Sequence, residues 1–466
     1  MGKKAKNVLT DKLSARIWFN ILIFGFIGSV AWNVENMYFN TFLYNSVYEG
    51  ASAVALAGAI EPITAINRMV SLSAVTAVVT TFVMGTFSDR LKKRKVFIAV
   101  GYILWGIVTA LFGFITRDNI ATLFSLTDGV KILSFTVWTV IIMDMVMTFM
   151  GSTSNDSAFN AWVTDVTSPS TRPAVETAFT LISFVAMGVV MGIGTKAQIG
   201  EISYKAFFGI LGIFVILCGI VGLFTLKEPE RKPHGESGNG YWADLFYGFR
   251  PKVIKENSRL YLTLASICIF NCAFQVFFPY LFVYLQYVVL ADSVNTALLS
   301  SLSPSLIAVA VGTVAVLVAG VIVLMKLSRK NKFFGFIPGA ICMVAGLAIL
   351  SSSTSLYTIL VGIAPTFIGY LVLTIQLNAA IRDYIPEGKA GLFQGIRMIF
   401  YVLIPMVVGP EIGHIACRSA GATYINEYGA ETIVPDAKMF LYSAVTALLI
   451  FIPIFILLKK SKETKK

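Results

Sequence analysis

The sequence has few of the residues that build metal sites or disulfide frameworks. Among 466 residues it contains only two histidines and five cysteines. His234 and His414 lie far apart in expected loops, so we expect no metal site. Four cysteines lie in apolar runs, where a thiol usually packs, and Cys417 stands alone in an expected loop. No G-x-x-x-x-G-K-[ST] stretch occurs, which argues against a nucleotide-binding domain, and we expect no cofactor.

Long polar stretches are equally scarce, and long apolar stretches take their place. Hydrophobic residues make up 56% of the sequence, charged residues 13%, and the mean hydropathy is +0.78. A membrane-spanning helix takes about 20 mostly apolar residues. Twelve windows qualify: 18–42, 63–86, 96–115, 132–156, 175–195, 206–226, 260–289, 303–325, 334–350, 357–381, 392–410 and 438–458. We therefore predict an all-α integral membrane protein with twelve transmembrane helices.

The net charge of +12 follows the membrane topology. With twelve spans, 30 of the 37 Lys and Arg residues fall on the side of the N-terminus and six on the other side. Such an excess marks the cytoplasmic side, so we expect both termini there and a multi-pass protein of the cell membrane. The distribution explains the charge without nucleic acid as a partner. We expect a monomer in the lipid bilayer.

The polar segment 227–259 divides the spans into six and six. It predicts an N-terminal half, 1–226, and a C-terminal half, 260–466. An internal repeat supports this division, because Asn160-Ala161-x-x-x-Asp165 recurs as Asn378-Ala379-x-x-x-Asp383. Two six-helix pseudo-repeats are typical of transporters that bind solute near the bilayer midplane.

A short basic hairpin between the second and third windows carries a family resemblance. It resembles the signature loop of the major facilitator superfamily, roughly G-x-x-x-D-R-x-G-R-R/K, at Gly85, Asp89, Arg90, Lys93 and Arg94, whereas Lys92 departs from it. This resemblance implies the major facilitator fold.

Two further stretches resemble one branch of that superfamily. Residues 155–172 and 382–397 look like the helix 4–5 and helix 10–11 regions of the glycoside–pentoside–hexuronide:cation symporters and the related sucrose transporters. Sodium-coupled members of this branch carry two aspartates in helix 2, where this sequence has Ala77 and Thr81. A coupling proton, or no coupling ion, is therefore favoured over sodium.

Polar residues form faces on predicted helices 1, 4, 7 and 10, which line the cavity in the superfamily. An ionisable group within a span is costly and indicates function. The alternative for each amide is a hydrogen bond that holds helices together. The candidate substrate or coupling residues are Asp144, Glu35, Asn33, Asn36, Asn155, Asn271, Gln275, Thr374 and Asn378.

Asp144 is the favoured coupling acid. It lies about 12 residues from either end of its predicted helix, which places it near the bilayer midplane. Glu35 is its rival, in the outer part of helix 1. A structural alternative for Asp144 is a permanent pairing with a neighbouring helix.

Charged residues near the cytoplasmic ends form a second candidate group. In the resembled family such residues latch the two halves together, and the alternative is solvated loop charge, worth about 0–1 kcal/mol per exposed pair. The predicted cytoplasmic gate comprises Asp89, Arg90, Arg94, Asp165, Arg172, Asp383 and Arg397.

The function that fits these features is secondary transport of a small polar solute, a sugar or glycoside, by alternating access. A lipid or drug porter of the same superfamily is the alternative, which an apolar cavity would favour. A polytopic membrane enzyme, such as a transferase, would need the membrane histidines or metal cluster that are missing. A transporter-derived receptor or scaffold is disfavoured by the small loops and the lack of soluble domains.

Overall fold

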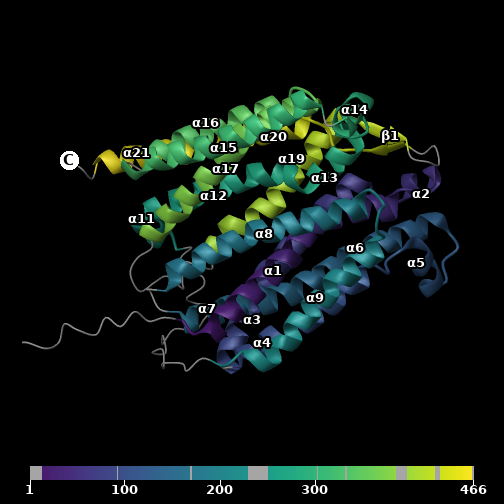
Figure 1. Ribbon diagram of the computed structural model, residues 1–466, viewed down its shortest axis with the longest axis horizontal. Coiled ribbons are helices and arrows are strands. Elements are labelled where there is room, and N and C mark those ends of the chain that lie inside the picture. The colour runs from purple at the N-terminus through teal and green to yellow at the C-terminus, as the bar shows by residue number, and fades with distance from the viewer. Residues whose placement is uncertain are drawn as a thin grey trace, which may run out of the picture. The chain divides into compact units, whose positions relative to one another are not determined.

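The computed structural model is almost entirely helical (Figure 1). It describes residues 13–91, 93–167, 171–228, 250–301, 303–330, 333–384, 396–425 and 431–463. The helices up to residue 228 are α1 (Ala15–Phe42), η1 (Leu43–Tyr48), α2 (Ala53–Gly58), α3 (Pro62–Leu91), α4 (Arg94–Phe112), α5 (Arg117–Phe124), α6 (Gly129–Gly151), η2 (Ser152–Phe159), α7 (Asn160–Val166), α8 (Arg172–Gln198) and α9 (Tyr204–Thr225).

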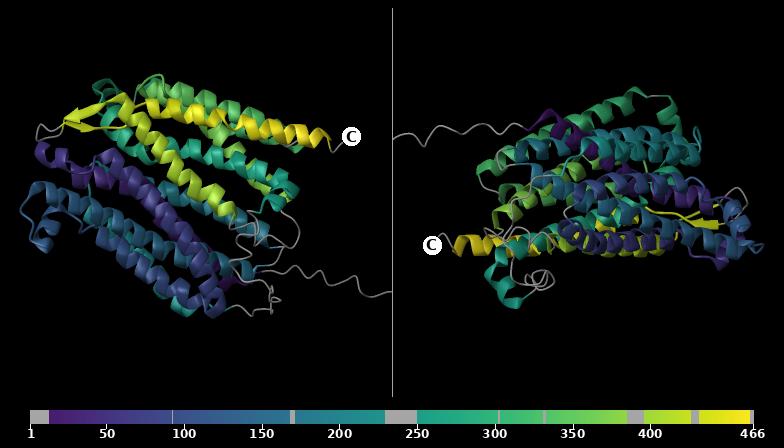
Figure 2. Two further views of the ribbon diagram at one scale, coloured as in Figure 1. Left: turned by 180° about the vertical axis from the view of Figure 1, so that it is seen from behind. Right: turned by 90° about the horizontal axis from the view of Figure 1, so that it is seen from below.

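The elements after residue 249 include the only strands of the described residues. They are α11 (Pro251–Glu256), α12 (Ser258–Phe277), η3 (Phe278–Tyr280), α13 (Leu281–Tyr284), η4 (Leu285–Val289), α14 (Ser293–Ser300), α15 (Pro304–Lys330), α16 (Phe333–Leu350), α17 (Leu356–Tyr384), η5 (Ile399–Leu403), α19 (Ile404–Ala420), β1 (Thr423–Ile425), β2 (Glu431–Ile433), α20 (Lys438–Leu448) and α21 (Phe451–Glu463). The antiparallel β1–β2 hairpin lies at the end of these helices away from the C-terminus (Figure 2).

The prediction of an all-helical membrane protein is confirmed. Within the described residues, eleven helices are long and apolar enough to cross a membrane. The ninth predicted window, 334–350, corresponds to α16, whose apolar part Gly335–Leu350 is shorter. Several spans combine elements, because η1, η2, η4 and η5 are π-helical segments that continue or begin an α-helix.

One predicted helix boundary is wrong, and it changes the position of two residues that were expected in loops. The eleventh window was expected over 392–410, but the apolar helix runs over Ile396–Ala420. His414 and Cys417 therefore lie in α19 and not in a loop. Glu411, His414 and Arg418 lower the hydropathy of this last part. The helix persists because these side chains have partners at the start of α3, described below.

The chain forms two compact units. The first comprises Met1–Ala59 and Val75–Glu236, and the second comprises Ile60–Ala74 and Ser237–Lys466. The connecting residues 229–249 lie outside the described part. The first 15 residues of this second unit, Ile60–Ala74, lie within the predicted N-terminal half, and the division at the 227–259 segment stays a prediction.

Small residues allow close helix packing in the first unit. A Cβ added at Gly106 on α4 would lie 2.5 Å from the carbonyl oxygen of Gly212 on α9. A Cβ at Gly219 would lie 2.6 Å from the carbonyl oxygen of Ala99. Helices in a membrane gain stability from such contacts, because lipid tails provide no hydrophobic drive for their association. Glycine at these positions therefore determines how closely α4 and α9 approach.

Local sequence signals explain several helix ends. Ser14, Ser203 and Asp128 precede α1, α9 and α6, and each side chain accepts a hydrogen bond from a backbone N–H of the first turn. The last span divides into α20 and α21, and Pro453 lies in the first turn of α21. Proline has no N–H and its ring clashes with the carbonyl four residues earlier, here that of Leu449, where the helix is interrupted.

Candidate functional site

The first unit contains a buried carboxylate pair on two of its membrane helices. Glu35 on α1 and Asp144 on α6 are only 8% and 2% exposed. The hydroxyl of Thr148, one turn after Asp144 on α6, donates a hydrogen bond to Oε1 of Glu35 at 3.0 Å. Two acids from distant parts of the sequence therefore lie near one another within the apolar interior. A buried carboxylate in this setting is costly, which favours a function in binding or proton transfer.

A third acid lies further along the same helix. Asp156, in the π-helical segment η2, accepts a hydrogen bond from the hydroxyl of Ser152 at 3.1 Å, and Trp32 of α1 also approaches it. The rings of Trp32 and Trp105 lie 5.2 Å apart. Asp156 lies in the 155–172 stretch but is not among the predicted site residues. Its signal was an acid inside the predicted 132–156 span. We name Glu35, Asp144 and Asp156 together the acidic cluster; Asp144 and Asp156 are twelve residues apart, which is about 18 Å along the helix.

Asn155, which precedes Asp156, bonds to a different helix. Its side-chain amide donates to the hydroxyl of Tyr102 on α4 at 2.5 Å, and that hydroxyl donates to the carbonyl of Phe24 on α1 at 2.9 Å. Tyr102 is fully buried. A chain of hydrogen bonds thus links η2, α4 and α1. This contact fits the interhelical role that the sequence left open for each amide.

The predicted polar face of α1 is only partly buried. Asn36 donates to the carbonyl of Trp32 in its own helix at 2.7 Å, and Asn33 is half-buried. Asn40 is 3% exposed. Glu35 is the candidate on α1 whose side chain bonds to another helix of the site, through Thr148.

In the second unit, the four predicted candidates lie on α12 and α17. The Asn271 amide donates to the carbonyl of Tyr401 at 3.2 Å. Gln275 packs against Gly409 of α19, because a Cβ added at Gly409 would lie 2.5 Å from the Cβ of Gln275. On α17, the Asn378 amide donates to the carbonyl of Thr374 at 2.8 Å.

Arg397 joins this group, although the sequence assigned it to the cytoplasmic gate. Its guanidinium donates to Oδ1 of Asn378 at 2.9 Å and lies 5.4 Å from the ring centroid of Tyr401. A cation over an aromatic face is a favourable contact. Arg397 is therefore a neighbour of a predicted substrate residue, and it stays a gate candidate.

Two other gate candidates pair within the first unit. Nε of Arg94, at the start of α4, lies 2.8 Å from Oδ2 of Asp165 on α7. The carboxylate of Glu228 accepts from the backbone N–H groups of Arg94 and Lys95 at 3.2 and 2.8 Å. An acid at a helix N-terminus satisfies free N–H groups and complements the helix dipole. Glu228 had no recognisable sequence signal, because it follows its span by several residues and acts on a distant helix.

The remaining gate candidates cannot be assigned contacts. The side chains of Asp89, Arg90, Arg172 and Asp383 lie outside the described residues. Their role in a latch stays a prediction.

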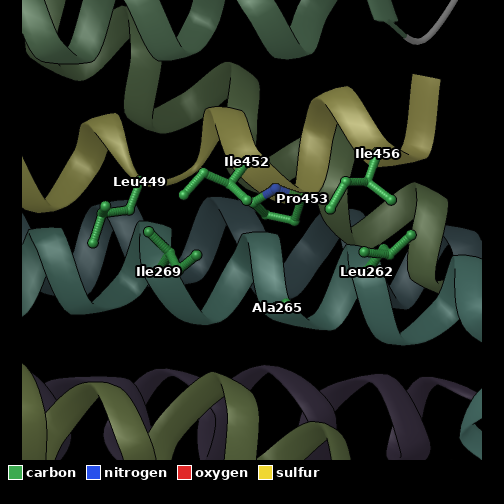
Figure 3. Close-up of a pocket in the computed structure, with 7 residues that line it drawn as sticks. All are labelled: Leu262, Ala265, Ile269, Leu449, Ile452, Pro453 and Ile456. Carbon is green, nitrogen blue, oxygen red and sulfur yellow. The ribbon is translucent and has the colours of Figure 1, made fainter. Parts of the chain in front are cut away.

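An apolar groove of about 370 Å³ lies on the second unit between α12 and the last span (Figure 3). Its lining residues are Leu262, Ala265, Ile269, Leu449, Ile452, Pro453 and Ile456. All seven side chains are apolar, so this groove offers a polar solute no hydrogen bond. In the described residues, no group of three or more His, Cys, Asp or Glu side chains is arranged to hold a metal ion.

Comparison with a curated protein gives one distant relative. The chain is 21% identical over 356 residues to Multidrug resistance protein 1 of Bacillus subtilis (strain 168), an alignment that covers 75% of this chain and 80% of the relative.

Two solved transporters share the fold over nearly the whole chain. One is a bacterial homologue of the human lysosomal transporter Spinster, in an inward-facing, unoccupied conformation, with 15% identity, a TM-score of 0.57 and coverage of 97% of this chain and 98% of that chain. The other is the nucleoside transporter NupG, with 11% identity, a TM-score of 0.61 and coverage of 95% and 98%. Residues 37–410 match the family model of the Major Facilitator Superfamily. The chain therefore belongs to the Major Facilitator Superfamily.

Proposed function

We propose that this protein is a secondary active transporter that moves a small polar solute, a sugar or glycoside, by alternating access with coupled proton movement. As a superfamily member it is a multi-pass membrane transporter and not an enzyme, and its partner is a small solute. We further propose that it works as a monomer in the cell membrane with both termini in the cytoplasm.

The observation that carries the coupling proposal is the acidic cluster. Glu35 and Asp144 are buried in membrane helices, and Thr148 holds the carboxylate of Glu35. A carboxylate can bind and release a proton, and its burial makes each change of charge energetically large. We assign Asp144 the role of coupling acid, with Glu35 as the second acid.

The proposal of a polar solute rests on side chains that can form several hydrogen bonds. Asn33 and Asn36 on α1 are half-buried, as are Asn271, Gln275 and Thr374 in the second unit. Half-buried amides and hydroxyls retain capacity for a further partner. Sugars present many hydroxyl groups, which match such a set. The two stretches that resemble the glycoside symporter branch point in the same direction.

A second candidate function is the export of organic cations. The Trp32–Trp105 ring pair lies beside Asp156, and carboxylates together with aromatic faces suit a cationic, partly apolar molecule. The distant relative is named as a multidrug resistance protein. This candidate uses the same acidic cluster, so the solute panel must decide between the two.

The test is transport by purified protein in liposomes. A labelled panel of sugars, glycosides, nucleosides and organic cations is offered with a proton gradient or a sodium gradient imposed separately. We expect accumulation of a sugar or glycoside with a proton gradient and none with sodium. Accumulation of organic cations alone would replace the first proposal by the second, and no transport of any panel member would contradict both.

The acidic cluster is tested in the same liposomes. Asp144→Asn and Glu35→Gln keep side-chain shape and remove the charge. We expect accumulation against a gradient to fall to the level of empty liposomes, while exchange down a gradient persists. Glu201→Gln is the matched control, because the Glu201 side chain is exposed in a loop. Its Oε2 lies 3.6 Å from Nζ of Lys196. If Asp144→Asn accumulates solute with unchanged pH dependence, Asp144 is not the coupling acid.

A further inference from the structure

Polar side chains fasten the N-terminal end of α3 to the C-terminal part of α19, both within the second unit. Oε2 of Glu61, just before α3, lies 3.4 Å from Nε of Arg418. The amide of Asn67 on α3 donates to Glu411 on α19. We define Glu61, Thr64, Asn67, Glu411, His414 and Arg418 as the α3–α19 clasp. The acidic cluster has no part in it.

Hydrogen-bond accounting fixes the state of the His414 ring. Thr64 has one hydroxyl proton, and its Oγ1 lies 3.1 Å from Oε2 of Glu61, which as a carboxylate can only accept. Thr64 therefore donates to Glu61. Nε2 of His414 lies 2.9 Å from the same Oγ1, so it must be the donor in that second bond. This assigns the proton of a neutral ring to Nε2.

The other ring nitrogen then faces an acid. Nδ1 of His414 lies 3.8 Å from Oε1 of Glu411 and is buried without a hydrogen-bond partner in the described residues. In the neutral ring, Nδ1 carries a lone pair, and two acceptors that lie this close to each other repel. A second proton converts it to a donor next to an acceptor. We propose that His414 is a proton-binding site that tightens the α3–α19 clasp.

The charges around the ring agree with this assignment. Glu61 and Glu411 contribute two negative charges and Arg418 one positive charge. Asp436, which precedes α20, lies near Cys417, and Cys417 is on α19 together with His414. The Arg68 side chain on α3 is exposed. With neutral His414 the clasp has a net negative charge, and a proton on the ring balances it. The His414 side chain is 12% exposed and that of Glu411 is 56% exposed, so water screens the pair from the Glu411 side.

This site has a consequence for α3 because that helix belongs to both units. Its residues up to Ala74 group with the second unit and those from Val75 with the first. A proton on His414 would add a charged contact to Glu411 in the clasped state alone, so the proposal predicts that lower pH increases the clasped population. Histidine is the side chain whose charge ordinarily changes between about pH 5 and pH 8, so the experiment covers that range. The inference does not depend on the solute or on the coupling acids.

The native Cys417 provides a reporter for release of the clasp. It is fully buried, on α19 between His414 and Arg418. In purified protein whose other four cysteines are replaced by alanine, the rate of alkylation of Cys417 by N-ethylmaleimide is measured from about pH 5.5 to pH 8.5. The same is done with His414→Gln. The ratio of the two rates at each pH cancels the pH dependence of the thiolate itself.

We expect the ratio of the His414→Gln rate to the parent rate to be near one at alkaline pH. It should rise about three- to tenfold on acidification, because only the parent gains the charged His414–Glu411 pair. A constant ratio across this range would overturn the proposal.

Two further variants make the test specific. Glu411→Gln removes the carboxylate that faces Nδ1, so its rate should follow that of His414→Gln, with no added effect in the double variant. His234→Gln is the matched control, since it changes the only other histidine in the sequence. If Glu411→Gln behaves like the parent, or His234→Gln like His414→Gln, the assignment to the His414–Glu411 pair is wrong. Should His414→Gln fail to fold, the Glu411→Gln profile decides alone.

Discussion

Individual polar residues in the membrane helices have two kinds of environment. Asn155 bonds to a tyrosine of another helix, and Asn378 bonds both to its own helix and to Arg397. Such bonds contribute to helix association. The acids of the acidic cluster are instead groups whose charged form a nonpolar interior opposes, so a purely structural role is hard to explain for all three.

Asn155 tests this distinction at the scale of a residue. Asn155→Ala removes the bond to Tyr102 but leaves the bond from Tyr102 to the carbonyl of Phe24. We expect the free energy of unfolding to fall by about 0.6–1.5 kcal/mol, while the KM for transport stays the same. Unfolding in detergent and initial uptake rates measure the two quantities. A raised KM with unchanged stability would return Asn155 to the solute site.

At the scale of elements, close contacts between helices depend on glycine. Gly106 and Gly212 lie where α4 and α9 meet, and each occupies space that a methyl group would need to share with backbone atoms of the other helix. Packed interiors tolerate such insertion poorly, because neither backbone can move without disturbing its other contacts.

Gly212→Ala should therefore separate α4 from α9. Its Cβ would lie 2.5 Å from the carbonyl oxygen of Gly106 and 2.7 Å from Cβ of Ala110. We expect a loss of about 1–3 kcal/mol in stability, seen as a lower midpoint of thermal unfolding. Gly209→Ala is the matched control on the same helix, since nothing lies within 4 Å of its added Cβ. Equal midpoints for the two variants would contradict the importance of this contact.

At the scale of the whole molecule, the orientation in the membrane rests on the distribution of cations. The 227–259 segment contains seven Lys and Arg residues, whereas the segment with the β-hairpin, between α19 and α20, has none. Positive segments are retained in the cytoplasm during insertion. The hairpin end is thus expected outside the cell.

Single cysteines test this orientation. Ser237→Cys and Thr423→Cys are placed separately in a cysteine-free protein, and Thr423 is exposed on β1. An impermeant thiol reagent added to intact cells should label the cysteine at 423 and spare the one at 237, and permeabilised cells should show both. The reverse pattern in intact cells would overturn the predicted topology.

The sequence by itself determined the fold class, because the length of apolar runs and the distribution of Lys and Arg can be counted along the chain. The bilayer thickness fixes the first requirement, and the retention of positive segments in the cytoplasm fixes the second. It also indicated Glu35 and Asp144, since an acid within an apolar run is visible without any structure. The basic hairpin likewise indicated the superfamily to which the chain belongs.

Only the tertiary structure decided which polar residues meet. Thr148 bonds to Glu35 across 113 positions, and Glu228 caps a helix that begins 134 positions earlier. The helical state of His414 and the grouping of the start of α3 with the second unit depend on contacts about 350 positions apart. Periodicity describes one face of one helix, and it contains no information on which distant helix covers that face.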